Sequence, residues 1–93
     1  MENKRVHLLI HGRVQGVFFR ASAQQKAQEL ELTGWVKNNS EGSVEVMAEG
    51  EGDNVESMIE WCRTGPSQAV VKHVSVDWEP LTGEFQEFRI EYI

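Results

Sequence analysis

A basic segment punctuated by glycines, residues 12–20, holds the residue types in this chain best suited to chemistry. It has the sequence GRVQGVFFR, with an apolar strand-like run over residues 6–10 before it and a helix-like stretch over residues 21–32 after it. A chain that turns from a strand through glycines into a helix directs several backbone N–H groups into one small space, where they and the helix dipole bind anions. Arg20, at the start of the helix, adds a fixed positive charge and a planar fork of donors that suits a phosphate. The segment therefore predicts a phosphate-binding site.

Two polar side chains, Arg20 and Asn38, are the candidates for direct roles at that site. An arginine is mildly unfavourable in the first turn of a helix, because the dipole is already positive there. A residue placed against its local preference is a hint of function. Asn38 lies beside a turn, where asparagine is common for conformational reasons alone. On composition and spacing, a functional pair and two solvated structural residues both stay open.

Several other chemistries do not fit the spacing of the residues. The glycine segment lacks the Gly-Lys-Ser/Thr ending of a nucleotide P-loop and the third glycine of a dinucleotide-binding turn. His7 and His11 lie four residues apart on a predicted strand, which separates them by about 13 Å along its axis. That is too far for one metal ion, so we predict no metal site and two histidines on the polar face of a sheet.

Nucleophilic catalysis by a cysteine or a serine is also disfavoured. Cys62 repeats at helical spacing with Val55, Met58 and Ile59, which predicts a small buried core residue and not an activated thiolate. Ser22 has no histidine–carboxylate pair near it in the sequence, so it is predicted to be a helix-surface serine.

The elements that must position these residues follow from the apolar periodicity. Strands are predicted over residues 5–11, 35–38, 43–49, 70–78 and 88–92. The first helix, residues 21–32, is amphipathic and is followed by the terminator Thr33-Gly34. A second helix is predicted to begin at an N-cap, Asp53, with Glu56 as its capping-box partner, and to stop at Gly65-Pro66.

This order, β-α-β-β-α-β with an extra C-terminal strand, is typical of the ferredoxin-like split β-α-β arrangement of the α+β class. We therefore predict an antiparallel sheet of four to five strands with two helices on one face. The chain of 93 residues is expected to form a single domain, residues 1–93.

Charge and composition limit the partners. The formal net charge of −6 and the scattered basic residues argue against nucleic acid, including an RNA-binding module on a similar sheet. No apolar run approaches the roughly 20 residues of a membrane span, and the polar start is unlike a signal peptide. The single cysteine fits a reducing cytoplasm. We therefore expect a cytoplasmic protein. We also expect a monomer, since no long apolar patch is evident.

Two separately placed motifs resemble the signatures of the acylphosphatase family. Residues 12–20 are similar to the first signature, with Phe18 at a position where many members carry glycine and others phenylalanine. Residues 34–38 are similar to the second. Later positions also match the spacing of the family, namely Gly42, Val44, Gly50 and the run Gly65-Pro66-Ser67. The resemblance covers essentially the whole chain.

The resemblance implies hydrolysis of the carboxyl–phosphate bond of an acyl phosphate, with inorganic phosphate as product and inhibitor and with no metal or cofactor. It implies that Arg20 binds the phosphoryl group and that Asn38 orients the attacking water. The backbone N–H groups implied to complete the phosphate site belong to Gln15, Gly16, Val17, Phe18 and Phe19. A non-catalytic domain of the same fold that binds phosphate, carbamoyl phosphate or a partner is the alternative. The physiological substrate stays open.

Overall fold

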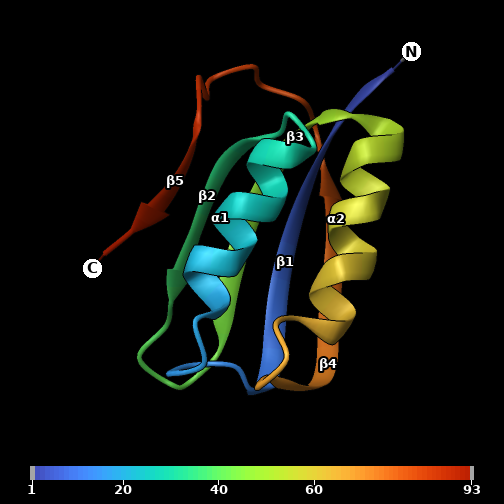
Figure 1. Cartoon of the computed structure of the whole chain (residues 1–93). Coiled ribbons are helices and arrows are strands. Elements are labelled where there is room, and N and C mark those ends of the chain that lie inside the picture. The colour runs from blue at the N-terminus through green and yellow to red at the C-terminus, as the bar shows by residue number, and fades with distance from the viewer. Residues whose placement is uncertain (1, 93) are drawn as a thin grey trace.

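The computed structural model describes residues 2–92, in which two helices cover one face of a five-stranded sheet (Figure 1). The elements are β1 (Asn3–Arg13), α1 (Phe19–Glu29), β2 (Thr33–Asn38), β3 (Val44–Glu51), α2 (Gly52–Thr64), β4 (Val70–Glu79) and β5 (Phe88–Glu91). The strands lie in the order β4-β1-β3-β2-β5. The predicted split β-α-β order with an additional C-terminal strand is confirmed.

The core lies between the sheet and the two helices, as the alternation in the strands predicts. On β1, Val6, Leu8 and Ile10 are fully buried beneath the helices, while Arg5 and His7 face the opposite side. Helix α1 presents small residues that let it approach the sheet closely, and α2 presents the apolar stripe expected of an amphipathic helix. The fully buried helix residues include Phe19, Ala23, Ala27, Val55, Met58 and Cys62.

Helix α1 begins and ends earlier than the predicted range of residues 21–32. It is closed by a Schellman motif, in which the Glu31 N–H donates to the Gln28 carbonyl at 3.1 Å and the Leu32 N–H donates to the Ala27 carbonyl at 2.9 Å. Glu31 adopts the left-handed conformation at φ 58°, a role that glycine usually fills. Because no glycine marks the end, the sequence pattern placed the boundary too late.

The predicted terminator Thr33-Gly34 is in fact the start of β2. Gly34 has φ 137°, and a Cβ there would lie 1.9 Å from the Met47 carbonyl oxygen of β3. Its N–H also donates to the Glu87 carbonyl at 3.0 Å. Gly34 is therefore required for the close approach of two strands and does not stop the helix.

The predicted capping box of the second helix is wrong. The N-cap of α2 is Glu51, with no hydrogen bond from a capping side chain, and Asp53 lies within the first turn, where its charge faces the positive end of the helix dipole. The Gly52 N–H donates instead to the Glu2 carbonyl at 2.9 Å. The predicted end is confirmed, because Gly65 follows the last turn at φ 70°.

The sheet is mixed, which corrects the prediction that it is antiparallel. The pairs β1–β3, β1–β4 and β2–β3 are antiparallel, but β5 pairs parallel to β2, with Gly34 opposite Phe88 and Lys37 opposite Glu91. The chain leaves β4 at one edge of the sheet and passes through residues 80–87 to the other edge (Figure 1). β2 runs against the direction of β4, so the reversal of the chain within residues 80–87 sets β5 parallel to β2.

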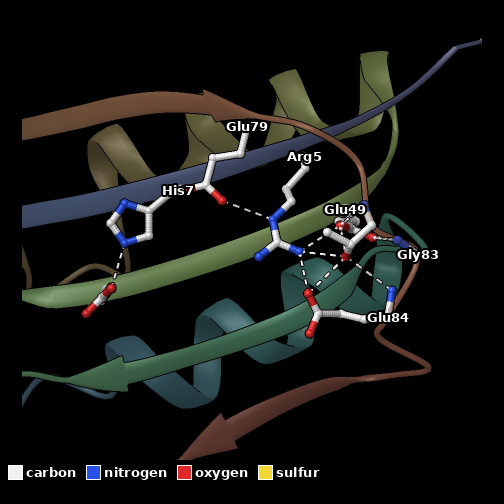
Figure 2. A network of polar contacts seen from close by, with 8 residues as sticks. Arg5, His7, Glu49, Glu79, Gly83 and Glu84 are labelled. Atoms are coloured by element: carbon white, nitrogen blue, oxygen red, sulfur yellow. Dashed lines mark hydrogen bonds and ion pairs between the residues drawn. The ribbon is translucent and has the colours of Figure 1, made fainter.

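An ion-pair network around Arg5 anchors this crossover on the face of the sheet away from the helices (Figure 2). The Arg5 guanidinium lies 2.9 Å from a carboxylate oxygen of Glu49 and 2.9 Å from one of Glu84, and its Nε lies 3.1 Å from Glu79. The side chains of Arg5 and Glu49 are 11% and 4% exposed. Three strands and the crossover segment thus share one nearly buried cation.

Glu49 completes the network by accepting hydrogen bonds from the backbone of the crossover. The Thr82 N–H donates to its Oε2 at 3.1 Å and the Gly83 N–H donates to its Oε1 at 3.0 Å. Burial raises the pKa of Glu49, but these N–H donors and the Arg5 guanidinium outweigh burial. The pKa consequently lies below the ordinary value of 4.5.

This lowered pKa predicts loss of stability in acid. A carboxylate with a lowered pKa in the folded state stabilises the fold above its ordinary pKa of 4.5, and that stabilisation disappears as the pH falls through the lowered value. We expect Glu49→Gln to reduce the free energy of unfolding near neutral pH by about 2–3 kcal/mol, because a nearly buried ion pair is broken. Urea unfolding at a series of pH values measures both effects.

The same series distinguishes Glu49 from the other carboxylates. Below pH 4.5 the curves of wild type and Glu49→Gln should approach each other, and they should meet once the pH lies below the lowered pKa of Glu49, because protonation then removes the same charge from the wild type. The exposed residue Glu56 provides the control, and Glu56→Gln should follow the wild type at every pH. Parallel curves for wild type and Glu49→Gln down to pH 3 would contradict the assignment.

Candidate active site

The β1–α1 loop, the end of β2 and the end of β5 surround one hollow of about 290 Å³. Arg20 and Asn38, predicted from the sequence as a pair, both line it. The other predicted residues that line it are Gly16, Phe18 and Phe19, whereas the predicted residues Gln15 and Val17 do not. Four lining residues were not predicted, namely Val14, Ala21, Ile90 and Tyr92. The volume is close to the lower end of the range for small-ligand pockets, roughly 300–1,000 Å³.

Two buried side chains anchor the β1–α1 loop, and two residues in the left-handed conformation shape its backbone. Val14 and Val17 are 1% and 4% exposed, so they fix the loop to the core from below. Gly16 at φ 75° and Phe18 at φ 64° turn the backbone between and after them. Left-handed residues alternating with ordinary ones make successive N–H groups converge into a concave anion-binding nest.

The N–H groups of this loop have no acceptor in the part of the chain that the structure describes. Among residues 2–92, no backbone or side-chain acceptor is assigned to the N–H groups of residues 15–19. Folded proteins pair the great majority of such groups, and the first N–H groups of a helix lack partners within the helix. Several unpaired donors at a helix N-terminus form a region of positive potential suited to an anion.

Gln15 links the loop to the neighbouring hairpin through its side chain. Its Nε2 donates to the Asn39 carbonyl at 2.7 Å and to the Ser43 carbonyl at 2.9 Å, both in the β2–β3 turn. Sequence reasoning considered only the backbone N–H of Gln15 and missed this contact. Because Asn39 is the neighbour of Asn38, the two bonds fix the position of Asn38 relative to the loop.

Asn38 lines the hollow and carries a buried hydrogen-bond acceptor. Its Oδ1 is buried, and within residues 2–92 it is the one buried side-chain polar atom that accepts or donates no hydrogen bond. A buried carbonyl oxygen without a donor is costly, and in native proteins such atoms call for a functional explanation. The position of Asn38 is set by β-sheet pairing with Val44 at the last step of β2.

Arg20 lies on the first turn of α1 and is half-buried. Its guanidinium carbon lies over the ring of Tyr92, 5.3 Å from the ring centroid. The structure assigns it no salt bridge or hydrogen bond to a residue in the range 2–92. An arginine in a concave site without a carboxylate partner keeps its N–H donors available for an anion.

The residues excluded from chemistry on sequence grounds have structural roles. His7 contacts Glu45 at 2.6 Å and His11 stacks on His73 with ring centroids 6.0 Å apart, so both lie on the polar side of the sheet as predicted. Cys62 is fully buried, and burial raises the pKa of its thiol to about 12, which confirms a core residue. Within residues 2–92, no three His, Cys, Asp or Glu side chains gather closely enough to hold one metal ion.

Neither helix described in residues 2–92 has the length and apolar character that crossing a membrane would require.

Comparison with known proteins gives a consistent result. The acylphosphatase family profile matches residues 6–90. The chain is 53% identical over 87 residues to the acylphosphatase of Methylococcus capsulatus, an alignment that covers 94% of this chain and 95% of the relative. It superimposes on an acylphosphatase structure from Coxiella burnetii with a TM-score of 0.90 and 44% identity, covering 96% and 93% of the two chains. The Bacillus subtilis acylphosphatase structure gives a TM-score of 0.92 at 35% identity, covering 96% and 99%.

The fold and the full-length relatives thus place the chain among small α+β hydrolases. The chain belongs to the acylphosphatase family, since both the profile and the relatives cover nearly its whole length. The reaction of this family is the hydrolysis of the carboxyl–phosphate bond of acyl phosphates, and the chain is a hydrolase of that type.

Proposed function

We propose that this chain hydrolyses acyl phosphates without a metal or cofactor, using the N–H groups of residues 15–19 and Arg20 to hold the phosphoryl group and Asn38 to orient the attacking water. The observation that carries the proposal is that three features, judged over residues 2–92, meet at one hollow. They are the unpaired N–H donors of the loop that lines it, an arginine without an acidic partner in that range, and Asn38 with its unsatisfied Oδ1. Donors suit the phosphate oxygens, and the lone acceptor suits an O–H of water.

Each group has a defined task in the reaction. The water oxygen attacks phosphorus as the bond between phosphorus and the carboxylate oxygen breaks, and the carboxylate leaves with the electron pair. Charge moves over the equatorial oxygens and toward the leaving carboxylate during this step. Loop N–H groups and Arg20 stabilise that charge, because fixed dipoles and a fixed cation require little reorganisation in the transition state. Asn38 holds the water in line for attack, which lowers the entropic part of the barrier.

Proton transfer requires little from the protein. A carboxylate is a good leaving group, so no general acid is needed for its departure. Water gives its proton to an oxygen of the substrate's own phosphoryl group, which accounts for the neutral character of Asn38. An amide can accept the hydrogen bond of a water without changing its own protonation state.

We further propose a cytoplasmic monomer with one domain over residues 1–93. The single cysteine fits a reducing compartment, and one continuous core joins the sheet to both helices. The substrate is a small-molecule acyl phosphate, and inorganic phosphate is both product and inhibitor. The loop binds both because it recognises the phosphate group that they share. Neither nucleic acid nor a membrane is a proposed partner of this acidic chain.

The test compares two substrates in excess chelator. We expect benzoyl phosphate to be hydrolysed at a rate that the chelator does not change, after subtraction of spontaneous hydrolysis. The monoester 4-nitrophenyl phosphate should react far more slowly, because its phenolate leaves less readily than a carboxylate and Asn38 supplies no proton. Folded protein that binds inorganic phosphate but leaves benzoyl phosphate intact would contradict the proposal and favour a non-catalytic phosphate-binding domain.

A further inference from the structure

We propose that Tyr92 is a positioning residue that holds the Arg20 guanidinium ready for phosphate through the face of its ring. The inference rests on the proposed role of Arg20 in phosphate binding. It assigns a role to the segment that follows β5, from which sequence reasoning drew no site residue.

The contact itself is direct. The Arg20 guanidinium carbon lies 5.3 Å from the centroid of the Tyr92 ring, and both residues line the hollow that Asn38 also lines. Tyr92 is 77% exposed, so its ring adds little to the buried core. The contact with the site arginine gives this exposed ring a favourable interaction that burial does not supply.

Sheet register places Tyr92 beside the catalytic candidates. In the parallel pair of β2 and β5, Lys37 lies opposite Glu91. Asn38 follows Lys37 at the end of β2, and Tyr92 follows Glu91 directly after β5. β5 is fixed in this register by the buried side chain of Phe88, whose carbonyl accepts a hydrogen bond from Gln24 of α1 at 3.2 Å. The same helix carries Arg20 on its first turn.

A ring in this place favours phosphate binding without contacting phosphate. The face of an aromatic ring attracts a guanidinium by cation–π interaction and leaves the N–H groups at the guanidinium edge available for oxygen atoms. Arginine has many rotamers, and fixing them at the moment of binding weakens affinity. With Tyr92 present, part of this ordering is complete before phosphate arrives. Removing the ring face should therefore weaken phosphate binding by about two- to tenfold.

The experiment separates the ring face from side-chain bulk. Tyr92→Phe keeps the face, whereas Tyr92→Leu keeps apolar bulk without it. Trp78→Leu is the matched control, because it removes a similar pair, Lys4 over Trp78 at 5.3 Å, from the edge strand β4. Inorganic phosphate affinity is measured by titration calorimetry and as competitive inhibition, and kcat/KM is measured with both acetyl phosphate and benzoyl phosphate. A thermal melt confirms that each variant is folded.

The Tyr92→Phe and Trp78→Leu variants should bind phosphate with an affinity within twofold of the wild type. The Tyr92→Leu variant should bind phosphate about two- to tenfold more weakly, and its kcat/KM should fall by the same factor for both substrates. If Tyr92→Leu binds phosphate as tightly as the wild type does, the inference is overturned. Hydrolysis of acyl phosphates by the wild-type protein would in that case still uphold the proposed function. A loss confined to benzoyl phosphate would also overturn it, and would show that Tyr92 contacts the acyl group. A wild-type protein that neither binds phosphate nor hydrolyses either substrate would overturn the proposed function itself.

Discussion

Replacing Arg20 with alanine should lower kcat/KM for benzoyl phosphate by about 10³- to 10⁵-fold, the range found when an arginine that stabilises phosphoryl transfer is lost. Within residues 2–92, Arg20 is the one cation that lines the hollow, so no neighbouring side chain there can replace its charge. Inhibition by inorganic phosphate should weaken at the same time, because the same charge holds the product. Steady-state kinetics with phosphate as a competitive inhibitor measures both quantities.

Two further variants sharpen this result. Arg20→Lys keeps the charge but lacks the planar fork, so it should recover only a small part of the lost activity. Lys26→Ala removes a cation from the same helix, one that contacts Glu29 at 4.0 Å and does not line the hollow, and it should have the activity of the wild type. Unchanged inhibition by inorganic phosphate in Arg20→Ala would refute the assignment of Arg20 to the phosphoryl group.

Replacing Asn38 with alanine should lower kcat by about 10²- to 10³-fold, comparable to the loss of one precisely placed hydrogen-bonding group in an active site. Inorganic phosphate should still inhibit as it does in the wild type, because the loop donors and Arg20 are intact. The separation of the two effects follows from the proposed task, since orienting water affects the transition state more than the binding of phosphate.

Stability provides an independent readout of the same variant. The Asn38 Oδ1 has no donor among residues 2–92, so its removal relieves a buried unsatisfied acceptor and should leave the free energy of unfolding equal to that of the wild type or slightly higher. Asn54→Ala on α2, away from the hollow, should retain full kcat as the matched control. Lost phosphate affinity with intact kcat in Asn38→Ala would reverse the roles assigned to Arg20 and Asn38.

Sequence patterns predicted correctly those features whose physical cause lies within one short segment of the chain. Strand alternation identified the buried face of β1, because side chains on successive residues point to opposite faces. The glycine-rich turn before a helix identified the loop and Arg20 for a similar reason, since a helix N-terminus has free N–H groups wherever it lies. The end of α1 was placed wrongly because Glu31 took a left-handed conformation that its residue type does not signal.

The amino-acid sequence was enough to predict the order of the elements, the apolar faces and the two residues that we assign to chemistry. Three features became visible only in the folded chain: Arg20 and Asn38 line one hollow, Gln15 fixes the loop to the β2–β3 turn, and Tyr92 lies against Arg20. All three depend on pairings between segments distant in the chain, above all the crossover that sets β5 parallel to β2. Such pairings are selected by the packing of the whole domain, and periodicity within one segment contains no information about which other segment it will meet.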